Sequence, residues 1–115
     1  MTTEEAYAQI GADYNEVLGR LGSREMVKRF SGKFLNDKSY ENLTTAMENQ
    51  DAAEAFRAAH TLKGICLNLG FSRLFTVSSD LTECLRGGSM DGAPALYEKV
   101  KAEYENTIQA IQGID

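Results

Sequence analysis

The middle of the chain reads Asp51-Ala-Ala-Glu-Ala-Phe-Arg-Ala-Ala-His60-Thr-Leu-Lys-Gly-Ile-Cys-Leu-Asn-Leu-Gly70. On a helical wheel its small and aliphatic side chains fall within an arc of roughly 120°, about the width of a core-facing stripe. They are Ala55, Ala58, Ala59, Leu62, Ile65, Cys66 and Leu69. Asp51 and Glu54 have the spacing of a capping box, and Gly70 suits a C-terminal cap. We therefore predict one unbroken helix that begins after Asp51 and ends near Leu69.

Amphipathic patterns on both sides of this stretch predict further helices. The expected elements are one or two short helices over residues 4–21 with a break at Gly11, a helix capped by Ser23, a helix capped by Ser39, a helix over residues 71–86, and a last helix that begins near Pro94. Short connections between consecutive amphipathic helices favour antiparallel neighbours. The predicted fold is all-α, a single domain over residues 1–115. We expect an antiparallel up-and-down four-helix bundle with additional N-terminal helices packed across it.

Composition narrows the classes of function. The chain has 115 residues, 43% of them hydrophobic, and a net charge of −5. An acidic chain without a basic cluster is a poor nucleic-acid binder, because Lys and Arg supply most of that affinity. Its apolar stretches fall short of the roughly 20 residues that span a bilayer. The acidic N-terminus is unlike a signal peptide, so we expect a cytoplasmic protein with reduced cysteines, and a monomer.

The only histidine, His60, lies opposite the core stripe on the wheel. The residues on its side are Phe56, Arg57, Lys63, Gly64 and Leu67, with Phe71 in line if the helix continued. A glycine inside a helix costs about 1 kcal/mol relative to alanine, so Gly64 needs a reason. One turn from His60, it leaves space beside the imidazole, and Lys63 places a cation nearby. A nucleophilic ring with a cation and a cleared surface suits a phosphoryl group.

The segment Ala59-His60-Thr-Leu-Lys63-Gly64, followed by Asn68-Leu69-Gly70, resembles the signature of histidine-containing phosphotransfer (HPt) domains. These helical bundles relay phosphoryl groups between the aspartates of receiver domains. The close match covers residues 51–70, and Phe56-Arg-Ala-Ala-His60 is also similar to the phosphotransfer domain of chemotaxis kinases. The sequence departs from many relatives at Ile65, Cys66 and Leu67, where they carry Ser or Ala. Ile65 and Cys66 belong to the core stripe, whereas Leu67 faces the histidine side and bears on the choice of receiver.

The resemblance implies a role for each residue on this face. His60 is the phospho-acceptor, Lys63 supports the phosphate or the imidazole, and Gly64 gives steric clearance. The expected partner-binding residues are Phe56, Arg57, Leu67 and Phe71. The expected partners are the receiver domains of a hybrid histidine kinase, a response regulator, or both. The chain has no Gly-rich phosphate loop, so we expect no ATP site, no cofactor of its own, and Mg²⁺ held by the receiver.

Two other readings stay open at this point. The bundle is alternatively a binding module that docks through Phe56 and Leu67 without phosphotransfer, or a separately encoded phosphotransfer domain that a chemotaxis-type kinase phosphorylates in trans. A Cys–His nucleophile is disfavoured, because Cys66 lies roughly 120° from His60 around the helix and points inward. A zinc site needs three or four ligands, and one histidine with two distant cysteines has no such spacing.

Overall fold

The polypeptide forms helices only, in a computed structural model that describes residues 1–115. The elements are α1 (Thr3–Gln9), α2 (Tyr14–Leu21), α3 (Arg24–Lys33), the 3-10 helix η1 (Phe34–Asn36), α4 (Ser39–Glu48), α5 (Ala52–Leu69), α6 (Ser72–Leu85) and α7 (Ala93–Gln112). The prediction of an all-α fold is confirmed. No helix combines the length and the apolar character that crossing a membrane requires.

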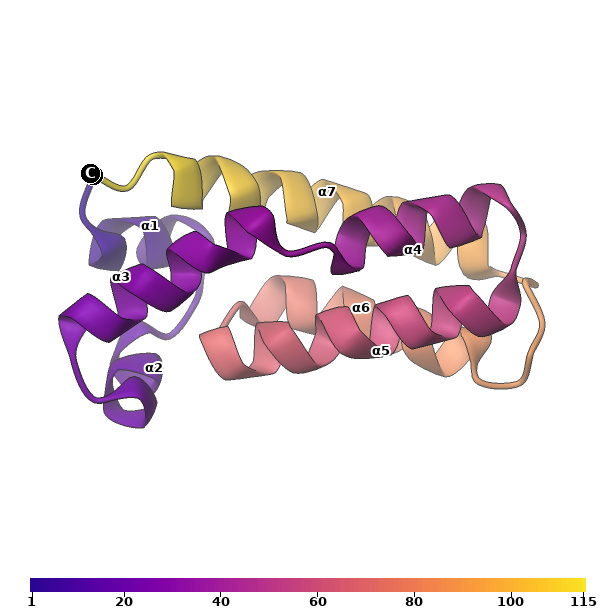
Figure 1. The fold of residues 1–115 in the computed structure, drawn as a ribbon, viewed down its shortest axis with the longest axis horizontal. Coiled ribbons are helices and arrows are strands. Elements are labelled where there is room, and N and C mark those ends of the chain that lie inside the picture. Colours follow the sequence, from indigo (N-terminus) through magenta and orange to yellow (C-terminus); the bar gives the residue numbers. More distant parts are fainter.

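Helices α4, α5, α6 and α7 form the bundle that the sequence predicts (Figure 1). Helix α5 packs between α4 and α6, and α6 also packs against α7. Helix α3 precedes α4 along the same long side of the molecule, while α1 and α2 lie at one end (Figure 1). The elongated body measures 41 × 23 × 20 Å, and α5 lies along it.

Helix α5 is unbroken and has both predicted ends. The Asp51 carboxylate accepts a hydrogen bond from the Glu54 N–H at 3.2 Å, and Gly70 ends the helix with a φ of 72°. The second half of the capping box is absent, because the Glu54 side chain pairs with Arg57 instead. The predicted stripe is buried except for Ile65, which is half-buried at the edge of the core. The outward face of α5 is therefore fixed by burial of the opposite face.

The N-terminal helices hold the C-terminal end of α5. The Tyr7 hydroxyl donates a buried hydrogen bond to the Leu69 carbonyl at 2.7 Å. Arg20 Nη1 donates to the carbonyls of Leu67 and Asn68 at 2.8 and 2.7 Å. The last carbonyls of a helix have no partner within it, so these bonds satisfy groups that α5 leaves open. Burial also raises the pKa of the Tyr7 phenol, which keeps it protonated as a donor.

Two expectations about caps have different outcomes. Ser23 caps α3, since its hydroxyl accepts the Met26 N–H at 3.2 Å. The expectation that Ser39 caps the next helix is wrong, because Ser39 is already the first residue of α4. Its own N–H donates to the Asp37 carboxylate at 2.9 Å. The N-cap of α4 is Lys38, whose side chain makes no capping hydrogen bond, and the Asp37 carboxylate satisfies only the first N–H of the helix.

The cysteines are free thiols in unequal surroundings. Cys66 is fully buried in the core, and this burial raises the pKa of its thiol, with a further contribution from the charge of Asp37. Cys84 is half-buried at the C-terminal end of α6, with its sulfur 3.1 Å from the Asp91 carbonyl oxygen. A protonated thiol inside the core packs as a small apolar side chain, as the position of Cys66 on the wheel predicts.

Candidate functional site

His60 lies in the middle of α5 and is exposed. It borders an open surface hollow of about 580 Å³ between α5 and the C-terminal end of α6. The residues that line this hollow, which we call the His60 hollow, are Ala53, Phe56, Arg57, His60, Thr61, Leu85, Arg86 and Gly88. The wheel thus predicts the exposure of the imidazole correctly, and the structure brings His60, Phe56 and Arg57 together.

Phe56 lies between the imidazole and a cation. Its ring meets that of His60 at 88°, with the ring centroids 5.9 Å apart. The central guanidinium carbon of Arg86 lies 5.2 Å from the centroid of the same phenyl ring, within the range of a cation–π interaction. Phe56 is half-buried and packs against the core, so it is both a core-edge residue and a wall of the hollow.

Arg86 is bound to an acidic residue of its own helix end. Its Nε and Nη2 donate to the two carboxylate oxygens of Glu83 at 3.0 and 2.9 Å, a bidentate pair. The hydrogen bond from Arg86 is the largest cause of a lowered pKa for the Glu83 carboxyl, and the fields of Lys63 and His60 lower that pKa further. Through Arg86, the Glu83 carboxylate of α6 is thus tied to the edge of the His60 hollow.

Gly64 and Lys63 lie one turn further along α5 than His60. A β-carbon built on Gly64 meets no atom within 4 Å, so the surface there is open. Lys63 is half-buried and forms no ion pair, whereas Arg57 is paired with Glu54 and Arg86 with Glu83. Lys63 is thus the cation on this face of α5 that has no ion pair, and neither it nor Gly64 lines the His60 hollow.

The other two expected partner-binding residues lie outside the His60 hollow. Leu67 is 55% exposed, more than any other large apolar side chain of the chain. Phe71 is only 1% exposed, and its assignment to the binding face is wrong. The helix ends at Gly70 in a left-handed conformation, which turns Phe71 into the core, where its ring packs against Tyr7 and Phe34. The wheel does not hold beyond that glycine.

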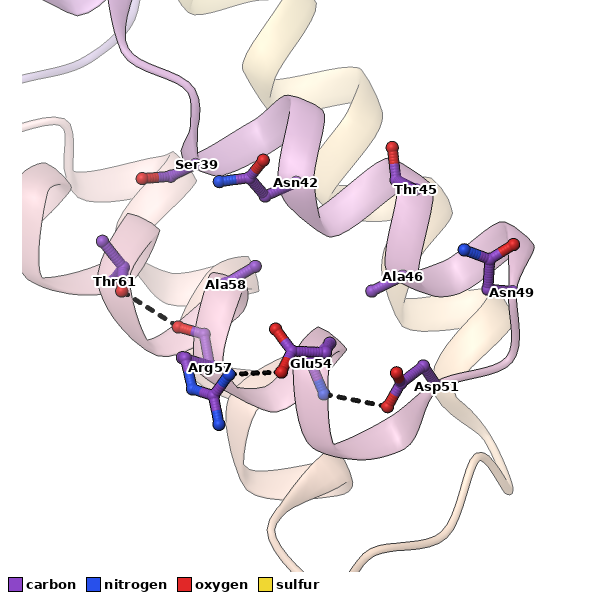
Figure 2. A pocket seen from close by; sticks show the side chains of 10 residues that line it. All are labelled: Ser39, Asn42, Thr45, Ala46, Asn49, Asp51, Glu54, Arg57, Ala58 and Thr61. Carbon is purple, nitrogen blue, oxygen red and sulfur yellow. Dashed lines mark hydrogen bonds and ion pairs between the residues drawn. The ribbon is translucent and has the colours of Figure 1, made fainter.

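A second hollow, of about 350 Å³, lies between α4 and α5 (Figure 2). Ala46 and Ala58 face each other across it, and the polar side chains along its edges include Asn42, Thr45 and Glu54 (Figure 2). Arg57 and Thr61 border both hollows. The Thr61 hydroxyl donates to the Arg57 carbonyl at 3.0 Å, as Figure 2 shows. The ridge that carries Arg57 and Thr61 therefore separates a polar groove from the histidine site.

The sequence pattern does not predict the roles of Arg86 and Glu83 at this site. Helices α5 and α6 form an antiparallel hairpin about Gly70, and residues at similar distances before and after the turn lie opposite each other. Phe56 and Arg86 have such positions, and they are in contact. Similar spacing of Phe56 and Arg86 from the turn at Gly70 was therefore the feature of the sequence that could have placed Arg86 at the site. The structure contains no cluster of three or more His, Cys, Asp or Glu side chains that could hold a metal ion.

Comparison with known families agrees with this arrangement. The model of the Hpt domain family matches residues 36–112, a span that runs from the end of η1 to the end of α7 and includes His60, Lys63 and Gly64. No curated protein and no solved structure matches the chain significantly. Because the match covers more than half of the sequence, the chain belongs to the Hpt domain family. Hpt domains act in histidine phosphotransfer within phosphorelays and interact with receiver domains.

Proposed function

We propose that His60 carries the phosphoryl group in this protein, accepting it from a receiver-domain aspartyl phosphate and passing it to another receiver aspartate. The observation that carries this proposal is the position of the only imidazole. It is exposed at mid-helix, within the span of the family match, at the edge of an open hollow. With no other histidine in the chain, histidine phosphotransfer here has a single candidate acceptor.

The chemistry is a reversible exchange of one bond to phosphorus. An unprotonated ring nitrogen of His60 attacks the phosphorus atom of the aspartyl phosphate, and the N–P bond forms as the P–O bond breaks. The receiver aspartate leaves as a carboxylate. In the second transfer a carboxylate attacks phosphorus, the N–P bond breaks, and the imidazole is restored. Such transfers depend on positioning and charge stabilisation, which Phe56 and Lys63 support from this side.

The remaining parts of the site come from the partner under this proposal. The receiver supplies the aspartate and holds the Mg²⁺ that neutralises the transferring group. The partners would be the receiver of a hybrid histidine kinase, that of a response regulator, or both. Open space beside Gly64 allows a second domain to approach the ring, and the exposed Leu67 extends the apolar part of the same helix face.

The direct test uses a receiver domain loaded with acetyl phosphate and Mg²⁺. The receiver is mixed with the wild-type chain and with His60→Gln, and the label on the chain is followed. We expect the wild type to take up label that acid removes and base does not, as a phosphohistidine requires. We expect none on His60→Gln, whose circular dichroism spectrum and melting curve should match the wild type because the side chain is exposed.

The alternatives give different results in the same assay. A binding module would bind the receiver without taking up label in either form. A domain served by a chemotaxis-type kinase would gain label from the kinase catalytic domain and ATP, and none from a phosphorylated receiver. Label that persists on His60→Gln would falsify the assignment of the acceptor.

A further inference from the structure

We propose that the ion pair with Glu83 keeps Arg86 at the His60 hollow but only partly available to a phosphoryl group on His60. Glu83 thereby limits how strongly that group is stabilised. This inference rests on the proposed function of His60 and adds a positioning residue from α6. Glu83 acts in it through Arg86 and touches neither the phosphate nor the receiver.

Geometry brings the two residues to the site. Arg86 lines the same hollow as His60 and lies over the Phe56 ring, which in turn contacts the imidazole. The two guanidinium nitrogens that bind Glu83 are occupied, while Nη1 donates no hydrogen bond within the chain. Arg86 can therefore offer Nη1 to a new anion in the hollow while it stays paired. It can offer the other two nitrogens only after it leaves Glu83.

Arg86 can leave Glu83 at a small cost in free energy. Both side chains of the pair are more than half exposed, 54% for Arg86 and 57% for Glu83. Ion pairs in such positions add little stability, because water screens them and two flexible side chains must be ordered. A phosphoryl group carries up to two negative charges and three acceptor oxygens, so it competes well for a guanidinium.

The second arginine at the hollow is held in the same way, because Arg57 pairs with Glu54. A site with three uncommitted cations would hold the phosphoryl group too firmly for a relay that must release it. With Arg86 and Arg57 paired to Glu83 and Glu54, Lys63 remains the unpaired cation, and the phosphoryl group stays transferable.

The test compares phosphorylation equilibria between the chain and one receiver domain in Mg²⁺. The forms are the wild type, Glu83→Gln, Arg86→Gln and the double variant. The matched control is Glu41→Gln, which removes the acid of an exposed pair with Lys38 outside the hollow. We expect Glu83→Gln to raise the ratio of phosphorylated to free chain roughly two- to fivefold, the range for an exposed charge pair. We expect Arg86→Gln to lower this ratio and to abolish the effect of Glu83→Gln.

Two readouts separate positioning from a structural role. The gain in Glu83→Gln should shrink at about 1 M salt, where the screening length falls to about 3 Å. The NMR signal of the Arg86 Nε–H should shift on phosphorylation of the wild type. An unchanged ratio in Glu83→Gln, or an equal gain with and without Arg86, would overturn the inference while leaving His60 as the acceptor. Label on His60→Gln would instead overturn the proposed function beneath it.

Discussion

The rings of Phe56 and His60, one helical turn apart on α5, meet at 88° with their centroids 5.9 Å apart. Such a perpendicular contact is worth about 0.5–1.5 kcal/mol beyond the area that it buries. The contact favours one orientation of an imidazole that is otherwise exposed.

Replacing this wall of the hollow should slow transfer. In Phe56→Leu the side chain still covers the core edge, but both the ring contact with His60 and the cation–π contact with Arg86 are lost. We expect a transfer rate roughly two- to tenfold lower, in line with the energy of an aromatic pair. Rapid-quench kinetics with a phosphorylated receiver give the rate. An unchanged rate, with faster ring motion seen by NMR, would show that orientation by Phe56 is unimportant.

Gly64 should separate helix stability from access to the ring. Because a β-carbon there meets no neighbour, Gly64→Ala should stabilise the protein by up to about 1 kcal/mol in urea unfolding. Gly64→Gln should also fold, yet block transfer by filling the approach to His60. The control is Gly19→Gln in α2, another helical glycine with open space around it. Normal transfer in Gly64→Gln would remove the steric explanation for this glycine.

Local sequence patterns predicted most of α5, whereas they did not predict contacts between different helices of the bundle. The core-facing stripe of α5 and its ends at Asp51 and Gly70 depend on residues that are close along the chain. They can therefore be predicted from the sequence alone. The helical wheel misplaces Phe71 because α5 ends at Gly70, which has a left-handed conformation. Arg86 was missed because its place depends on the register of the α5–α6 hairpin.

Residues at the edge of a predicted stripe or helix were also placed less accurately. Ile65 lies at the margin of the core arc, and it is half-buried beside Phe30 in a shallow hollow instead of fully covered. Ser39 has the residue type of a cap, but α4 already begins at Ser39, and its own N–H donates to the Asp37 carboxylate. In both cases the residue type fits the predicted role, but the position of the residue in the folded chain does not.

Leu67 should contribute to docking and not to folding. The side chain is 55% exposed, so Leu67→Glu should leave the unfolding free energy nearly unchanged. Loss of an apolar contact in a small interface should weaken receiver binding by about 2 kcal/mol. Leu35→Glu is the matched control, since Leu35 is also an exposed leucine, at 40%, but belongs to η1 and not to α5. Calorimetry or NMR titration with a receiver measures both, and equal affinities would exclude Leu67 from the interface.

Tyr7 should make stability depend on alkaline pH. Burial raises its pKa above the ordinary value of 10.0, so the folded state holds the phenolic proton more tightly than the unfolded chain. Its contribution is complete below about pH 10 and declines as the pH rises through the folded-state pKa. Tyr7→Phe also loses the bond to the Leu69 carbonyl, which should cost about 1–3 kcal/mol at neutral pH.

The check on Tyr7 is a series of urea unfolding curves from about pH 8 to pH 11. Above about pH 10 the stability of Tyr7→Phe should fall less steeply than that of the wild type. Some slope should remain, because burial also raises the pKa of Tyr40 and Tyr104. Parallel curves for the two proteins would show that folding does not raise the pKa of Tyr7.

Lys63 should assist transfer without being required for it. Arg57 and Arg86 are paired with Glu54 and Glu83, so Lys63 is the cation that would be available to a phosphoryl group on His60. Under the proposed function the nucleophile is the His60 ring nitrogen, so Lys63→Ala keeps the acceptor. A hydrogen bond to a charged group contributes about 1.5 kcal/mol or more, which corresponds to a roughly tenfold slower uptake of label. Lys63→Arg should restore most of the rate, and Lys99→Ala, an exposed lysine on α7, should have none of this effect. If Lys63→Ala matched the wild type at low salt, the paired arginines, and not the lysine, would be the groups that meet the phosphate.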